Sequence, residues 1–103
     1  MEPYDTIESC EGFDWDQGER DKNWRRHGVT DAECEQIFFN HPLVVRHDSE
    51  HSQEHEIRFY ALGHTDRARL LFLVFTVRDQ LIRVISARDM SKEERRIYTD
   101  VEN

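Results

Sequence analysis

The second half of the chain alternates apolar and polar residues, whereas the first half spaces its apolar residues as a helix does. Strict alternation predicts a strand with one buried face. Residues 70–77 are apolar on both sides, which is typical of a central strand. The predicted strands cover residues 43–45, 56–62, 70–77 and 81–87, joined by a polar loop at 46–55 and turns at 63–68 and 78–80.

Three predicted helix starts carry a capping box, in which a side chain before the helix and an acid three residues later bind each other's backbone amides. Gly28 stands where a left-handed residue commonly ends a helix, so the first helix is predicted to stop near His27. Pro42 prevents the second helix from continuing. A short strand at residues 12–15 precedes the first helix, and the last helix runs to about Tyr98. The boxes pair Asp16 with Glu19, Thr30 with Glu33, and Ser91 with Glu94.

These elements follow one another in the order β-α-α-β-β-β-β-α. Sequential strands with helices kept at the chain ends predict an α+β fold, a small antiparallel sheet with two N-terminal helices and one C-terminal helix. The length of 103 residues suits one domain, which we place at residues 12–103. Residues 1–11 are acidic and are expected to form a flexible extension. No apolar run is long enough to cross a membrane, so no membrane partner is expected.

The net charge of −8 argues at first against a nucleic-acid binder. Residues 1–16, however, carry six acids and no base, and twelve of the fourteen basic residues are Arg. Arginine is suited to planar, bidentate contacts with phosphate or carboxylate, so a local anion site is compatible with an acidic chain. The two cysteines lack the spacing of a disulfide framework or a metal motif, and a cytoplasmic location is expected.

A candidate site lies on the polar side of residues 56–62. Glu56, Arg58 and Tyr60 share that side, and Arg78 and Arg83 arrive from neighbouring strands. If the helices cover the other face of the sheet, this face is open and could bind a phosphodiester, with the guanidinium groups stabilising its charge. Alternatively, Glu56 and Arg58 are cross-strand ion-pair partners on a solvated surface.

The position of Arg88 does not fit the same face of a regular strand as Arg83. A regular strand places Arg83 and Arg88 on opposite faces, because the spacing of five is odd. Both can serve one site only if the strand ends or twists before Arg88.

Histidines offer two further possibilities. His27 is a candidate acid or base with a pKa near neutrality, or a residue stabilised by the helix dipole. The polar loop could bind a metal ion, but it lacks compact ligand motifs, and a solvated loop without metal is the expectation. No phosphate-binding or dinucleotide motif is present, so no cofactor is expected. The loop and its borders contain His41, His47, Asp48, His51, Glu54 and His55.

Several segments together resemble the BrnT family of toxins from type II toxin–antitoxin systems. The matching residues are Phe13-x-Trp15-Asp16, Asn23, His27-Gly28-Val29, Glu35, Phe38-Phe39-Asn40-x-Pro42, Asp48, Glu56-x-Arg58, Gly63, Arg69-Leu70, Phe75-Thr76-x-Arg78, the run from Ile82 to Arg88, Glu94-Arg95 and Tyr98. The pattern departs from the family at Glu19, where Lys or Asn is common.

The resemblance implies a RelE-like fold and a metal-independent endoribonuclease that inhibits translation. It also implies a BrnA-like antitoxin, with which the toxin forms a complex that binds operator DNA. Carried onto this chain, the catalytic candidates are His27, Glu56, Arg58, Arg78, Arg83 and Arg88, and the RNA-binding candidates are Lys22, Arg26, Tyr60 and Arg69. Two other classes stay open, a non-catalytic module that uses its Arg-rich face to bind an acidic partner and a metalloenzyme that uses the His-rich loop.

Overall fold

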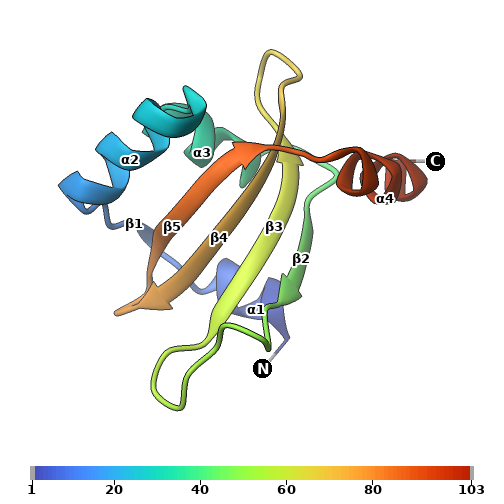
Figure 1. Cartoon of the computed structure of the whole chain (residues 1–103). Helices are drawn as coiled ribbons and strands as arrows, with labels where there is room; N and C mark the ends of the chain where they lie inside the picture. The colour runs from blue at the N-terminus through green and yellow to red at the C-terminus, as the bar shows by residue number, and fades with distance from the viewer. Residues whose placement is uncertain (1, 103) are drawn as a thin grey trace.

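The computed structural model describes residues 2–102, apart from the side chains at positions 18–21 and 102. Its elements confirm the predicted order β-α-α-β-β-β-β-α and add one helix in front of it (Figure 1). Along the chain they are α1 (Pro3–Glu8), β1 (Gly12–Phe13), α2 (Gln17–His27), α3 (Asp31–Ile37), β2 (Val44–His47), β3 (Arg58–His64), β4 (Leu70–Arg78), β5 (Leu81–Asp89) and α4 (Lys92–Glu102).

The five strands form one sheet in the order β1-β5-β4-β3-β2. β4 is the middle strand, as its two apolar faces predicted. The strands from β2 to β5 pair antiparallel, but β1 pairs parallel with β5, so the sheet is mixed and the prediction of a purely antiparallel sheet is wrong at this edge. Two left-handed residues, Asp79 and Gln80, make the tight turn between β4 and β5.

One face of the sheet carries the main core. Phe59, Leu73 and Phe75 on this face pack against Cys34 and Ile37 of α3. Burial of these side chains supplies the main stabilisation, at about 25 cal/mol for each Å² of apolar surface removed from water. Helices α1, α2 and α3 all lie against β-strands, and side chains of α1 and α3 belong to this core.

The helix caps agree with the sequence where they are described. Thr30 and Glu33 form the predicted capping box, and Gly28 has a left-handed φ of 62° after α2. At the start of α4, the Ser91 amide donates to Glu94 at 2.8 Å and the Glu94 amide donates to the Ser91 hydroxyl at 3.2 Å. The predicted box at Asp16 and Glu19 lies outside the described side chains.

The N-terminal segment differs from its prediction. A flexible extension is expected over residues 1–11, whereas Pro3–Glu8 folds into helix α1. Tyr4 anchors this helix to β2, since its hydroxyl donates to the Leu43 carbonyl at 2.9 Å and accepts from the Val45 amide at 3.1 Å. Apolar side chains that follow Tyr4 also contact the core. The prediction of a flexible segment was based on its acidic composition, which gives no information about these contacts.

Helix α4 lies on the opposite face, at one end of the sheet (Figure 1). Its Tyr98 is fully buried and donates to the Pro42 carbonyl at 2.6 Å. The expectation that helices cover only one face is therefore wrong at this end, and the remainder of that face is left for polar chemistry. In the described part of the chain, no helix has the length and apolar character needed to span a bilayer.

Candidate active site

Three arginines and the Glu56 carboxylate line one cavity at the uncovered end of the sheet. Arg58 faces Thr76 in the register of β3 with β4, and Thr76 faces Arg83 in the register of β4 with β5. Neighbouring strands lie about 4.8 Å apart, so this row holds two guanidinium-bearing residues about 10 Å apart across Thr76. A cavity of about 170 Å³ is lined by Glu56, Arg58, Thr76, Arg78, Arg83 and Ile85.

A β-bulge explains how Arg83 and Arg88 come to share a face. Ser86 pairs with Val74, but Val84 pairs with Phe75, so Ile85 is an extra residue in β5. The extra residue corrects the odd spacing, because one bulge shifts all later side chains to the other face. Arg88 consequently stands opposite Phe72, on the same face as Arg83.

The contacts of the three converging arginines are loose. Arg58 Nε lies 3.3 Å from Glu56, Arg78 lies 4.0 Å from the same carboxylate, and Arg83 lies 3.5 Å from Asp16. A strong charge-assisted hydrogen bond is about 2.7–2.9 Å long. The three arginines and their two partners, Glu56 and Asp16, together carry three positive charges and two negative charges. Because positive charge is in excess, an anionic ligand can compete with the carboxylates for these guanidinium groups.

Arg88 is held differently. Its two terminal nitrogens bind both oxygens of Glu94 at 2.8 and 2.9 Å, and its guanidinium lies 4.1 Å from the centre of the Phe72 ring. The hydrogen bond with Glu94 raises the pKa of Arg88. Burial alone would raise the pKa of Glu94, but hydrogen bonds from Arg88 and from the Ser91 amide outweigh it and lower that pKa. These contacts attach α4 to the sheet.

Arg69 is also committed to the fold. Its guanidinium donates to Asp89 at 2.8 and 3.2 Å and to Glu33 at 3.1 Å, and it binds the carbonyl oxygens of His27 and Gly28. The hydrogen bond with Asp89 is the main cause that raises the pKa of Arg69. This one side chain therefore connects the α2–α3 turn to the sheet.

His27 is not brought together with Glu56. It is exposed, and its carbonyl oxygen accepts from Arg69, which also binds Asp89 at the end of β5. Arg83 is six residues earlier in β5, which corresponds to roughly 15–20 Å of strand. Lys22 and Arg26 lie on the same helix as His27, while Tyr60 lies on the arginine-bearing face and stacks on Phe72 with ring centres 5.7 Å apart.

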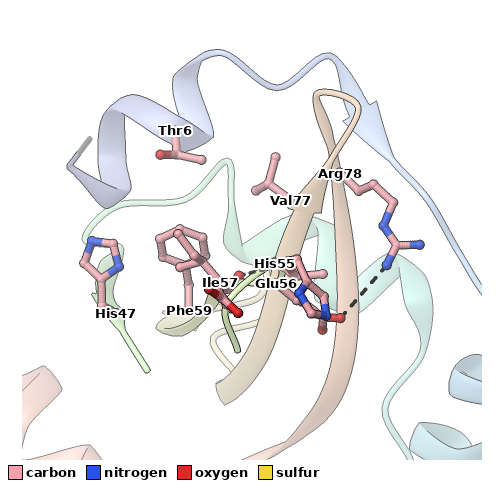
Figure 2. A pocket seen from close by; sticks show the side chains of 10 residues that line it. Thr6, His47, His55, Glu56, Ile57, Phe59, Val77 and Arg78 are labelled. Atoms are coloured by element: carbon pink, nitrogen blue, oxygen red, sulfur yellow. Dashed lines mark hydrogen bonds and ion pairs between the residues drawn. The ribbon is translucent and has the colours of Figure 1, made fainter. Parts of the chain in front are cut away.

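A second cavity, drawn from close by in Figure 2, adjoins the arginine cluster of Arg58, Arg78 and Arg83. Its volume is about 460 Å³ and it shares Glu56, Thr76 and Arg78 with the smaller cavity. His47 and His55 line it, and His55 lies next to Glu56 in Figure 2. The sequence offered these histidines only as metal ligands or loop residues. The adjacency of His55 and Glu56 in the chain was the signal that could have placed a histidine at this cavity.

One histidine of the His-rich loop contacts a carboxylate of the same loop. His51 Nδ1 lies 3.0 Å from Asp48. Among the side chains that the structure describes, no three His, Cys, Asp or Glu residues are placed to hold a metal ion.

Comparisons with known proteins agree on one family. Residues 15–94 match the family model described as "Ribonuclease toxin, BrnT, of type II toxin-antitoxin system". The fold is similar to the 1.1 Å crystal structure of the ribonuclease toxin BrnT of Brucella abortus, with a TM-score of 0.59 and 21% identity, over 81% of this chain and 100% of that one. No curated protein matches the chain.

The family match covers most of the chain and includes the three converging arginines and Glu56. The expected α+β architecture and the resemblance to this family are both confirmed. The chain belongs to the BrnT family of ribonuclease toxins from type II toxin–antitoxin systems.

Proposed function

We propose that Arg58, Arg78 and Arg83 bind the phosphodiester that this ribonuclease toxin cleaves. The observation that carries the proposal is that these arginines line one cavity with Glu56 and lie 3.3–4.0 Å from the carboxylates of Glu56 and Asp16, in contrast to the tight pairs of Arg69 and Arg88. A phosphate carries the oxygen acceptors that guanidinium groups bind in bidentate fashion, and it would replace the carboxylate as their partner.

When phosphate replaces Glu56 as the partner of the arginines, the Glu56 carboxylate becomes free to act as the general base. The 2′-hydroxyl of the RNA transfers its proton to the Glu56 carboxylate and attacks the adjacent phosphorus. The bond from phosphorus to the 5′-oxygen breaks, and that oxygen takes a proton from His55 or from water. The products are a 2′,3′-cyclic phosphate and a 5′-hydroxyl end, so the reaction needs no metal ion. The arginines stabilise the charge that develops on the phosphate oxygens.

The remaining candidates take other roles. We assign Tyr60 to RNA contact, because it lies on the arginine-bearing face. Lys22 and Arg26 on α2 would add contacts to RNA outside the cluster. His27, Arg69 and Arg88 are not assigned a step, since the first is remote and the other two bind internal carboxylates.

The partner implied by the family is an antitoxin, and we propose a BrnA-like protein that covers the arginine-bearing face. The complex would bind operator DNA mainly through the antitoxin, because a chain with a net charge of −8 gives weak non-specific attraction to DNA. The site of action we propose is the cytoplasm. Co-purification with the antitoxin, followed by a gel shift with and without each partner, tests this assignment.

Cleavage of RNA by the purified chain in EDTA tests the site. Arg83→Ala and Arg58→Ala should each lower kcat/KM by about 100- to 1,000-fold, as is typical when a donor to the transition state is removed. Arg67→Ala is the matched control, because Arg67 is exposed on a turn at the other end of β3. A 2′-deoxy substitution at the cleaved nucleotide should abolish the reaction. If Arg83→Ala cleaves as fast as the parent, the site is misplaced.

A further inference from the structure

The larger cavity beside the arginine cluster has two kinds of wall. Its apolar side is formed by Ile57, Phe59 and Val77, and its polar side includes His47 and Glu54. A volume of about 460 Å³ falls within the range of about 300–1,000 Å³ that small-molecule sites occupy. The mixed lining suits a flat ring with an apolar face and a hydrogen-bonding edge.

A stacking surface lies where the two walls meet, at His47 and Phe59. The His47 ring lies 5.0 Å from the Phe59 ring, centre to centre, at an angle of 39°. Phe59 is itself buried and stacks on Phe75 at 5.4 Å, so its position is fixed by the core. His47 is exposed on the edge strand β2. Proteins that bind single-stranded RNA commonly stack unpaired bases on Phe, Tyr, Trp or His rings.

Helix α1 completes the cavity from above in Figure 2, where Thr6 points toward it. The Tyr4 contacts with Leu43 and Val45 fix this helix over β2. The family match begins at residue 15, so this part of the wall comes from a segment outside the match.

The polar wall offers an acceptor. Glu54 is exposed at the cavity, and its carboxylate forms no hydrogen bond or ion pair with any residue that the structure describes. A carboxylate has two acceptor oxygens and no donor. The Watson–Crick edge of guanine presents two parallel donors, N1–H and the N2 amine, whereas uracil presents a single N3–H and adenine and cytosine each place one amine beside a ring acceptor.

We propose that this cavity binds a nucleobase next to the cleaved phosphate, with guanine preferred, through stacking on His47 and hydrogen bonds to Glu54. The inference rests on the proposed phosphate site, because Glu56, Thr76 and Arg78 line both cavities and a nucleotide would place its phosphate in one and its base in the other.

Calorimetric titration of the full chain with inorganic phosphate and with the 3′- and 5′-monophosphates of the four nucleosides tests this. Phosphate alone reports on the arginine cluster, and the gain from phosphate to nucleotide reports on the base cavity. Each nucleoside monophosphate should bind about tenfold more tightly than phosphate, in line with one stacked base, and guanosine monophosphate about tenfold more tightly again through Glu54. His47→Ala should remove the gain that all four nucleotides share, while leaving the affinity for phosphate unchanged.

Glu54→Gln should reduce the preference for guanine over the other bases by roughly tenfold, as expected for the loss of a bidentate base contact. Glu50→Gln is its matched control, because Glu50 is exposed in the same loop and does not line the cavity. A nucleotide affinity equal to that of phosphate overturns the base cavity while the phosphate site stands. An equal gain for all four bases overturns the assignment of Glu54. If the parent chain does not bind inorganic phosphate, both proposals are overturned.

Discussion

Replacement of Arg69 by alanine should destabilise the protein and leave the arginine cluster intact. Arg69 binds two carboxylates, Asp89 and Glu33, and two backbone carbonyls at the α2–α3 turn. Its removal breaks the connection of this turn to the sheet and leaves those four acceptors to water. None of these four acceptors belongs to the arginine cluster around Glu56, so the substitution leaves the contacts of that cluster in place.

The magnitude follows from the burial of the partners. A hydrogen bond to a charged group is worth about 1.5–3 kcal/mol when shielded from water. The side chain of Arg69 is 29% exposed, that of Glu33 26% and that of Asp89 54%, so water screens most of this value. We expect a loss of about 2 kcal/mol in the free energy of unfolding, and a fall of roughly 10 °C in Tm for a domain of this size.

The loss should depend on pH. The hydrogen bonds from Arg69 hold the pKa of Asp89 below its ordinary value. Burial alone would raise the pKa of Glu33, but contacts with the Thr30 backbone and Arg69 outweigh it and lower that pKa. A carboxylate with a depressed folded pKa contributes stability above the unfolded pKa, near pH 4, and loses it as pH falls through the folded value. The difference between parent and Arg69→Ala should therefore be largest at neutral pH and shrink below about pH 4.

Urea unfolding at several pH values measures this difference, and RNA binding is measured on the same samples below their Tm. Arg67→Ala is the control and should change stability by less than about 0.5 kcal/mol, because Arg67 is exposed and makes no ion pair with a described residue. If Arg69→Ala keeps the parental stability and loses RNA binding, the structural role of Arg69 is refuted and the original assignment of Arg69 to RNA contact is restored.

Three further substitutions test local packing and capping, each by chemical denaturation. Gly63→Ala should cost about 1–3 kcal/mol, because the new Cβ would lie 2.9 Å from the Cβ of Ile37; an unchanged stability would mean that α3 can move away freely. Thr30→Ala should cost about 1 kcal/mol through loss of the cap on α3, with Thr30→Ser as the variant that retains it. Tyr4→Phe should cost about 1–2 kcal/mol because the Val45 amide loses its acceptor, and a neutral result would show that α1 does not depend on this contact.

Local signals predicted most of the fold. The capping boxes at Thr30 and Ser91 and the left-handed Gly28 act over four residues or fewer, so the sequence alone placed these helix ends well. Helix α1 was missed because its stability comes from Tyr4 bonding to β2, forty residues away in the chain. A polar, acidic composition gives no sign of such a contact.

The site needed information that no local pattern carries. Periodicity placed Arg83 and Arg88 on opposite faces, and only the extra residue Ile85 in β5 reverses this. Yet the shared face does not make one site, because Arg88 binds Glu94 with both terminal nitrogens while Arg83 contacts Asp16 at 3.5 Å. The chemistry of an arginine here is decided by how tightly an internal carboxylate holds it. Residue type and sheet face are the same for both, so the difference arises only when α4 folds back onto the sheet.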